Sequence, residues 1–117
     1  MRHKVKKVRM GSDKDHKTAL MRNLAMSVII YEKIKTTQSK AKAVQPFVER
    51  LITIGKQENK QNAVRELERL LQHQNSSKKI MDVLIDKYKD KTSGYTRITK
   101  LGNRAGDNAP TVQLELI

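Results

Sequence analysis

The sequence predicts an α+β fold in which a group of helices precedes a β-hairpin. Apolar residues recur at helical spacing in four segments between Leu20 and Tyr88. Two later runs, residues 95–101 and 111–117, are rich in β-branched side chains or alternate between apolar and polar. The 117 residues suggest one domain, which can bury about two-thirds of its surface on folding.

The first helix is expected to run to about Lys33. Ser12, Asp13 or Asp15 would cap it, because short polar side chains accept hydrogen bonds from the free amides of a first turn. Its apolar residues follow helical spacing: Leu20, Leu24, Val28 and Tyr31, broadened by Met21, Ala25 and Ile29. A face this wide predicts that this helix is central and mostly buried.

Residues 33–38 alternate weakly and contain β-branched side chains, which predicts a short strand or an extended link. A second helix is expected over residues 38–56. Pro46 lies inside it and should kink the helix or mark a restart, because proline lacks the amide donor. Gly55 is a suitable helix stop. The apolar face of this helix consists of Ala41, Val44, Val48, Leu51 and Ile52.

Two further helices are predicted to form a helical hairpin. The third has a stripe made by Ala63, Val64, Leu67, Leu70 and Leu71, and the fourth has one made by Met81, Leu84, Ile85 and Tyr88. Residues 73–77 would connect them, with Ser76 or Ser77 as the cap of the fourth helix. Charges of both signs occur here, so we expect a scaffold or a surface for protein contacts.

The end of the chain predicts the β-hairpin. Val112, Leu114 and Leu116 share one face of its second strand. The connection from Gly102 to Pro110 is long for a tight turn, so we expect it to have a role of its own.

The net charge is the strongest indication of function. Twenty-five Lys and Arg residues face twelve Asp and Glu residues, which gives a formal net charge of +13. Such self-repulsion weakens a compact state unless an anion neutralises it. Nucleic acid is the favoured partner, and an acidic membrane surface is the second candidate. The charge is uneven, because residues 1–60 carry 15 basic and 5 acidic residues, whereas residues 61–117 carry 10 and 7.

Several other classes of function are disfavoured. The chain has no cysteine, which excludes disulfides, zinc ribbons and thiol catalysis and suits a reducing cytosol. The most apolar segment, residues 24–31, is too short to span a bilayer, and the basic start lacks the apolar run of a secretory signal. No phosphate-binding loop motif is present. We expect no enzymatic activity, no cofactor, no membrane and no small-molecule substrate; the enzymatic alternative is a metal-dependent nuclease using Asp13, Asp15 and His16.

The first part of the chain carries the main candidate contacts with nucleic acid. Residues 2–10 contain no acid and too little apolar area to form a core, so they should become ordered on a polyanion. We expect an arm over residues 1–12 and a single domain over residues 13–117. The contacts expected in the arm and the first two helices are Arg2, His3, Lys4, Lys6, Lys7, Arg9, Lys17, Arg22, Asn23, Lys40 and Lys42.

The start of the first helix also favours phosphate, because it combines free amides, a positive dipole end and nearby cations. The alternative is that Asp13 and Asp15 satisfy the dipole while the lysines are simply solvated. In the hairpin, Arg97, Lys100 and Arg104 lie in an acid-free run and offer a second contact. The alternative there is a solvated tip with glycines for turn geometry.

The kind of binding can be narrowed by the aromatic residues. Proteins that bind single strands stack bases on aromatic side chains. Tyr31, Phe47 and Tyr88 are expected in the core, which leaves Tyr95 alone. No recognition helix or dimer seam of a duplex DNA-binding protein can be identified. Binding should therefore depend on phosphates and on the shape of a structured nucleic acid.

Five blocks of sequence together resemble one protein family. They are Met1-Arg2-His3, His16-Lys17-x-Ala19-Leu20-x-Arg22-Asn23-Leu24, Thr36-Thr37-x-x-Lys40-Ala41-Lys42, Gly94-Tyr95-Thr96-Arg97-Ile98 and Arg104-x-Gly106-Asp107-x-Ala109-Pro110. Their order and spacing resemble the bacterial large-subunit ribosomal protein of the L17 family over essentially the whole chain. One departure is Ser12-Asp13-Lys14-Asp15, where family members usually carry basic and small residues, so these acids are expected to cap a helix rather than to contact RNA.

The resemblance implies an α+β domain with the order helix, strand, three helices, two strands, and four helices packed on a small mixed β-sheet. It implies a structural, non-catalytic component of the large ribosomal subunit in the cytoplasm. It implies binding to large-subunit ribosomal RNA on the outer face around the peptide exit tunnel, with neighbouring ribosomal proteins over part of the helices. The alternative function is a free-standing DNA- or RNA-binding regulator, which would bind selected sequences, as a dimer.

Overall fold

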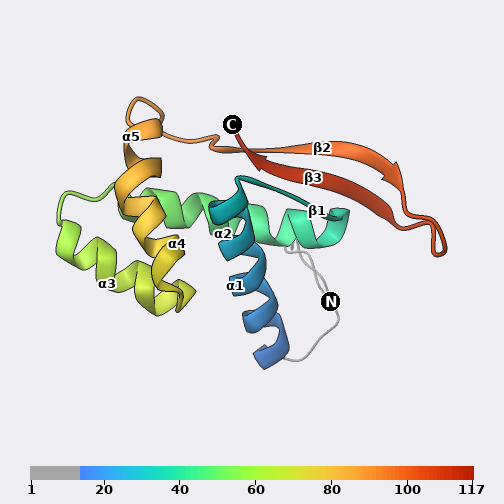
Figure 1. Ribbon diagram of the computed structural model, residues 1–117, viewed down its shortest axis with the longest axis horizontal. Coiled ribbons are helices and arrows are strands. Elements are labelled where there is room, and N and C mark those ends of the chain that lie inside the picture. Colours follow the sequence, from blue (N-terminus) through green and yellow to red (C-terminus); the bar gives the residue numbers. More distant parts are fainter. Residues whose placement is uncertain (1–13) are drawn as a thin grey trace, which may run out of the picture.

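The computed structural model describes residues 14–117. Its elements in chain order are α1 (Lys14–Tyr31), β1 (Lys33–Thr37), α2 (Gln38–Gly55), α3 (Lys60–Leu71), α4 (Gln74–Lys79), the π-helical turn η1 (Ile80–Leu84), α5 (Ile85–Lys87), β2 (Thr96–Asn103) and β3 (Pro110–Leu116). The backbone stays right-handed helical through both junctions of η1, so α4, η1 and α5 form one continuous helix. The α+β class and the predicted order of elements are confirmed (Figure 1).

β3 is the middle strand of the sheet. The strand order is β1-β3-β2, and both pairings are antiparallel. The prediction of a mixed sheet is therefore wrong. β3 follows β2 through a hairpin and therefore runs antiparallel to it. β3 also lies between β2 and β1, so β1 and β2, which run in the same direction, do not pair. As expected, Val112, Leu114 and Leu116 alternate along β3 on the buried face.

The central helix is α2 rather than α1. α2 contacts all three strands as well as α1, α3 and η1, and most of its aliphatic residues are fully buried. α1 buries only Ala25, Val28 and Ile29, and its N-terminal half projects from the body of the molecule (Figure 1). The expectation of a mostly buried first helix is wrong, because the buried residues of α1 all lie in its C-terminal half and its first turns are largely exposed.

The aromatic residues are arranged differently from the prediction. Tyr31 was expected in the core but is 72% exposed. It follows Val28 by three positions, about 60° around the helix, and so lies beyond the edge of the buried face. Phe47 is half-buried against the core.

Tyr88 and Tyr95 form a buried pair near the end of β3. Each is 2% exposed, and their ring centroids are 5.0 Å apart. The Tyr88 hydroxyl donates a 3.0 Å hydrogen bond to the Ile117 carbonyl, and the Ile117 amide donates one of 3.0 Å to the Tyr95 carbonyl. Tyr95, the aromatic residue expected outside the core, is therefore part of it.

α2 continues without a restart at Pro46. Of the two predicted alternatives, a kink or a restart, the restart is excluded, and the magnitudes explain why. An interior proline costs about 3 kcal/mol. Val44 and Val48, which flank it, are fully buried, and burying each stabilises the helix in place by about 1.5–3 kcal/mol.

The cap of the fourth helix is His73 rather than a serine. Its Nδ1 accepts a hydrogen bond from the amide of Ser76 at 3.2 Å. Ser76 and Ser77 lie inside α4, are buried, and donate their hydroxyls to the His73 carbonyl at 3.1 and 3.2 Å. The prediction that one of the serines caps this helix is wrong, because their hydroxyls bond back into the first turn.

Glu32 links α1, the fourth helix and the sheet. It joins α1 to β1 with a positive φ of 64°. Its carboxylate lies 3.8 Å from Lys79 Nζ and 3.6 Å from Lys87 Nζ, and its carbonyl accepts a 2.8 Å hydrogen bond from the Leu116 amide. One residue thus ties together segments that are more than eighty positions apart in the chain.

α2 ends at Gly55, as predicted, and the lack of a side chain there also leaves room for Ile80. A Cβ at this position would lie 2.8 Å from Cγ2 of Ile80.

Gly55→Ala should therefore lower the free energy of unfolding by about 1–2 kcal/mol. Overpacking costs about 1–3 kcal/mol, and the better helix propensity of Ala returns at most about 1 kcal/mol. Urea unfolding measures this change. The exposed control Ser39→Ala should shift stability by less than about 0.5 kcal/mol. In an Ile80→Ala background the Gly55→Ala penalty should shrink, and an undiminished penalty would refute the close approach.

Burial raises the pKa of the Tyr88 phenol to about 12, and the Glu32 carboxylate adds to the shift. In an unfolded chain this pKa is about 10. Because the pKa of Tyr88 is higher in the folded protein, this side chain contributes fully to the free energy of unfolding below about pH 10. That contribution is lost as the pH rises toward 12. Ultraviolet titration should show a late phenol ionisation that Tyr88→Phe removes. A late step that survives Tyr88→Phe would contradict the assignment.

Candidate nucleic-acid interface

The candidate contacts in the described part of the chain form three groups. The arm candidates Arg2, His3, Lys4, Lys6, Lys7 and Arg9 lie outside the described residues, as does Asp13. The other candidates are Lys17, Arg22 and Asn23 on α1, Lys40 and Lys42 on α2, and Arg97, Lys100 and Arg104 on and beside the hairpin. Figure 1 places the start of α2 and the projecting hairpin at the same end of the molecule, away from α3 and α5, whereas the start of α1 points elsewhere.

Arg22 joins α1 to the C-terminal end of α3. Its Nε donates a 2.9 Å hydrogen bond to the carbonyl of Leu70, in the last turn of α3. Carbonyls of a last turn lack partners within the helix and lie at its negative end, so a guanidinium there is favourable. The Nε of Arg22 is thus engaged within the fold, and its two terminal nitrogens are the donors left for a phosphate. Asn23 is exposed beside it, and Lys17 is half-buried on the projecting part of α1.

α2 begins with two cations and no acid. Lys40 and Lys42 are exposed near its start, and its first turn contains no Asp or Glu. Positive charges there oppose the helix dipole by about 0.3–1 kcal/mol each. The N-cap residue Thr37 makes no side-chain hydrogen bond to the first turn. An anion bound at this end would satisfy the amides and offset the unfavourable charge.

Two of the three hairpin cations are already paired with acids of the hairpin. Arg97 Nε lies 3.0 Å from Glu115 Oε1 on the neighbouring strand, and Arg104 donates hydrogen bonds of 3.1 and 2.5 Å to the two carboxylate oxygens of Asp107. Lys100 is exposed, and within residues 14–117 no acid pairs with it. Of the three, Lys100 is the one whose charge is uncommitted.

The loop at the tip of the hairpin is closed by its own hydrogen bonds. The Arg104 amide donates to the Ala109 carbonyl at 2.8 Å, and the Asn108 amide donates to the Arg104 carbonyl at 2.9 Å. Gly106 has a φ of +100°, which favours glycine. The side-chain hydrogen bond from Arg104 lowers the pKa of Asp107 to about 2, helped by the backbone amide of Ala109. The tip therefore presents a fixed backbone rather than a loose loop.

The structure adds two exposed lysines that sequence reasoning did not select. Lys33 and Lys35 lie on β1, and Ile34 between them is half-buried. The alternation Lys-Ile-Lys indicates that both lysines share one face if the segment is a strand. The segment was equally compatible with an extended link, which would not place them on one face.

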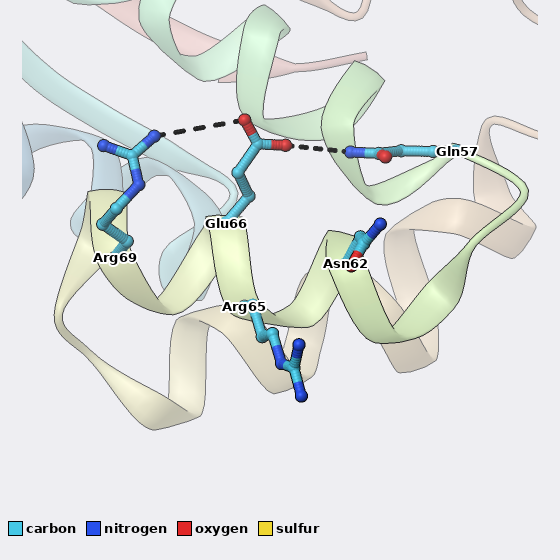
Figure 2. A pocket seen from close by; sticks show the side chains of 5 residues that line it. All are labelled: Gln57, Asn62, Arg65, Glu66 and Arg69. Atoms are coloured by element: carbon cyan, nitrogen blue, oxygen red, sulfur yellow. Dashed lines mark hydrogen bonds and ion pairs between the residues drawn. The ribbon is translucent and has the colours of Figure 1, made fainter.

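A depression of about 380 Å³ lies beside α3, lined by Gln57, Asn62, Arg65, Glu66 and Arg69. Figure 2 shows Glu66 between two neighbours: Gln57 Nε2 donates to it at 3.0 Å, and Arg69 Nη2 lies 4.0 Å from it. Arg65 points away from this carboxylate (Figure 2). Sites for small molecules are mostly apolar with a few convergent polar groups. This one has five polar residues whose acid is already paired, so it resembles an ordinary helix surface.

Two further observations concern the enzyme and membrane alternatives. Within residues 14–117, no three His, Cys, Asp or Glu side chains gather as they would around a metal ion. Asp15 and His16 of the nuclease alternative are exposed on the first turn of α1. Over residues 14–117, no helix combines the length and the hydropathy that a membrane span requires.

Comparison with known proteins relates this surface to one family. The profile of a family described as ribosomal protein L17 matches residues 20–117. The large ribosomal subunit protein bL17 of Syntrophotalea carbinolica is 41% identical over 117 residues, which cover the whole chain and 75% of that protein. The bL17 proteins of Ehrlichia ruminantium (strain Gardel) and Rickettsia bellii (strain OSU 85-389) are 42% and 39% identical over the whole chain, covering 94% and 82% of those proteins.

The carboxyl group of Asp107 should titrate at about pH 2 in the free protein, measured by carbon-13 NMR. In an unfolded chain its pKa is about 3.9. Because the folded pKa is depressed, the pairing with Arg104 is complete above about pH 4 and is lost as the pH falls toward 2. Arg104→Gln should return the pKa toward 3.9, whereas Lys100→Gln, which removes a hairpin charge that is not paired with Asp107, should not. A pKa near 3.9 in the unmodified protein would contradict the closed tip.

Proposed function

Because the chain belongs to the ribosomal protein L17 family, we propose that it is a structural constituent of the bacterial large ribosomal subunit in the cytoplasm. In this role it binds large-subunit ribosomal RNA mainly through phosphates. The observation that carries the proposal is the match along the whole chain at about 40% identity. The position that we propose, the outer face around the peptide exit tunnel, is the one that the family resemblance implies.

The physical support comes from the balance of charge. The chain carries a net charge of +13, and several exposed lysines in the described residues have no acid partner. Cations that neutralise phosphates release counterions, which supplies affinity without reading sequence. The buried Tyr88 and Tyr95 are unavailable for base stacking, and the exposed Tyr31 is a single ring rather than a platform of several aromatic side chains. The expected binding is therefore to a folded RNA by charge and shape.

We propose separate RNA contacts for three segments of the chain. The arm, residues 1–12, lies along RNA phosphates, and the single domain that follows holds the arm in place. Lys40 and Lys42 receive a phosphate at the start of α2, where the helix dipole also favours an anion. Lys100 and the tip of the hairpin make a separate contact, and Arg97 and Arg104 join it by exchanging a carboxylate for a phosphate.

The surface of α3 to α5 is proposed to adjoin neighbouring ribosomal proteins. Its charges are mixed, and exposed Val83 lies on the continuous helix between Lys79 and Lys87. Such a surface offers less to a polyanion than the other end of the molecule. An enzymatic role is not proposed, since the family is one of structural proteins.

Sedimentation of a cell lysate tests the proposed function. The protein should travel with the large subunit and leave it as the salt concentration is raised. A protein that remains at the top of the gradient and binds selected DNA sequences would overturn the proposal in favour of a free-standing regulator.

The arm can be tested separately with Lys6→Ala/Lys7→Ala/Arg9→Ala. Loss of three phosphate contacts should reduce the log–log salt slope of RNA binding by about 2–3 and lower occupancy on the subunit at raised salt. The matched control Arg65→Ala/Lys78→Ala/Lys89→Ala removes three exposed charges from α3 to α5 and its border, and should bind as the unmodified protein does. Equal occupancy of the arm variant and the control at raised salt would exclude the arm as a contact.

A further inference from the structure

The outer face of the sheet carries a second set of polar and basic side chains. Successive strand residues point to opposite faces, and Val112, Leu114 and Leu116 mark the inner one. Figure 1 shows the helices on that inner side. The register places eight polar residues on the outer face: Lys33, Lys35 and Thr37 of β1, Arg97 and Thr99 of β2, and Thr111, Gln113 and Glu115 of β3.

We propose that this outer face binds the phosphate backbone of RNA, with Lys33 and Lys35 as its principal contacts. The inference rests on the proposed function, since it adds a surface to the same RNA-binding protein. It differs from the contacts above in assigning a role to β1, on which no candidate residue had been placed.

The single carboxylate on this face, that of Glu115, pairs with the arginine and not with the lysines. Glu115 lies in the register between Lys33 and Arg97. Its carboxylate is taken by hydrogen bonds from Arg97 Nε at 3.0 Å, Gln113 Nε2 at 3.2 Å and the Thr99 hydroxyl at 3.5 Å. The side-chain hydrogen bond from Arg97 is the main reason that the pKa of Glu115 is lowered. Within residues 14–117, Lys33 and Lys35 make no ion pair, so both keep an uncompensated charge.

The composition of the face favours RNA over a protein partner. All eight side chains are polar, whereas protein interfaces have an apolar core and are depleted in lysine. Threonine hydroxyls commonly bond to sugar and phosphate oxygens, and that of Thr37 makes no cap hydrogen bond to α2. The hydroxyls of Thr99 and Thr111 already donate to Glu115 and to the Gly102 carbonyl, so the lysines are the main donors of this face. The face has no aromatic side chain on which a base could stack, so it would contact the backbone without regard to sequence.

The geometry suits an extended backbone rather than a single ion. Lys33 and Lys35 are two positions apart on one strand, about 7 Å, and β1 and β2 are separated by two strand spacings, about 10 Å. A flat area of this size has no walls to enclose a small anion. Long, flexible lysine side chains rising from it can reach successive phosphates of one strand.

This face is continuous in sequence with the start of α2. Residues 33–48 contain Lys33, Lys35, Lys40 and Lys42 and no acid. β1 ends at Thr37 and α2 begins at the next residue, so the four lysines lie on two elements joined without a loop. An RNA strand that contacts the start of α2 can therefore continue over the outer face of the sheet.

The test compares two charge-matched double variants of the full chain. Lys33→Gln/Lys35→Gln removes the two sheet lysines, and Lys78→Gln/Lys89→Gln removes two exposed lysines elsewhere. Each is titrated with purified large-subunit ribosomal RNA between 50 and 200 mM salt. The sheet variant should have a log–log slope shallower by about 1.4–1.8, so that the unmodified protein loses about seven- to twelvefold more affinity over this range. Lys33→Arg/Lys35→Arg should restore the slope.

The outcomes separate this inference from the proposed function. If the unmodified protein shows no salt-dependent affinity for the RNA, the proposed function fails and this inference with it. If the unmodified protein binds but the sheet variant has the slope of the control, only this inference is overturned. That result together with self-association of the sheet variant would show that the lysines protect an edge strand from pairing with other molecules. Thermal unfolding checks that each variant is folded, and Lys33→Thr/Lys35→Thr, which suits a strand, replaces the glutamine variant if β1 is weakened.

Discussion

The burial of α2 between the sheet and the other helices is the interaction on which the rest of the structure depends. Fully buried residues along this helix, among them Val44, Val48, Leu51 and Ile52, meet the inner face of the sheet and the buried residues of α1, α3 and η1. Each buried aliphatic side chain contributes about 1.5–3 kcal/mol. The stability of this core has to outweigh the self-repulsion of a net charge of +13. Within residues 14–117, the basic residues proposed to contact RNA lie on or beside α1, α2 and the sheet, which pack together around this core. The close contact of Gly55 with Ile80 shows how little space remains at one end of the helix.

The cations of the described chain fall into two kinds. Arg22, Arg97 and Arg104 have partners within the fold, and these fix the position of α1 against α3, of β2 against β3, and of the hairpin tip. The exposed ion pairs of Arg97 and Arg104 contribute little stability, so their value is in orientation. Arg22 instead donates a hydrogen bond to a backbone carbonyl. Lysines at the start of α2 and on the outer face of the sheet have no such partner. Other exposed cations, such as Lys78 and Lys89, are also unpaired, but the segment from β1 to the start of α2 holds four lysines and no acid. An external polyanion would be held there and at Lys100.

Most of the architecture could be predicted from the sequence, because periodicity reports which residues share a face. Periodicity does not report how many neighbours a face has, which is why α1 was expected in the central position of α2. Tyr31 fits the helical spacing of α1, yet it lies just outside the buried arc, and Tyr95 precedes the strand that brings it against Tyr88. In the candidate site, too, local features could be predicted and contacts made through packing could not. The exposure of Lys40 and Lys42 could be anticipated from their place at a helix start. The partner of Arg22 could not, since Leu70 is 48 positions away and meets it only through packing. Asp107, three positions from Arg104, was the one partner that local spacing could have indicated.

The position of β3 has a consequence for how the chain acquires its structure. The middle strand of the sheet is the last element in the chain, and β1 pairs with nothing but β3 within the described sheet. During synthesis, residues 33–37 cannot pair until residues 111–115, more than seventy positions later, have been made. The hydrogen bond from the Leu116 amide to the Glu32 carbonyl also cannot form before then. Such non-local pairing slows folding, because loop-closure entropy is lost before the contacts form. A nascent chain shorter than about 110 residues would be a set of helices with two unpaired β-segments and most of its positive charge. The complete sheet, and with it the outer face that carries Lys33 and Lys35, would then form only after β3 has been made.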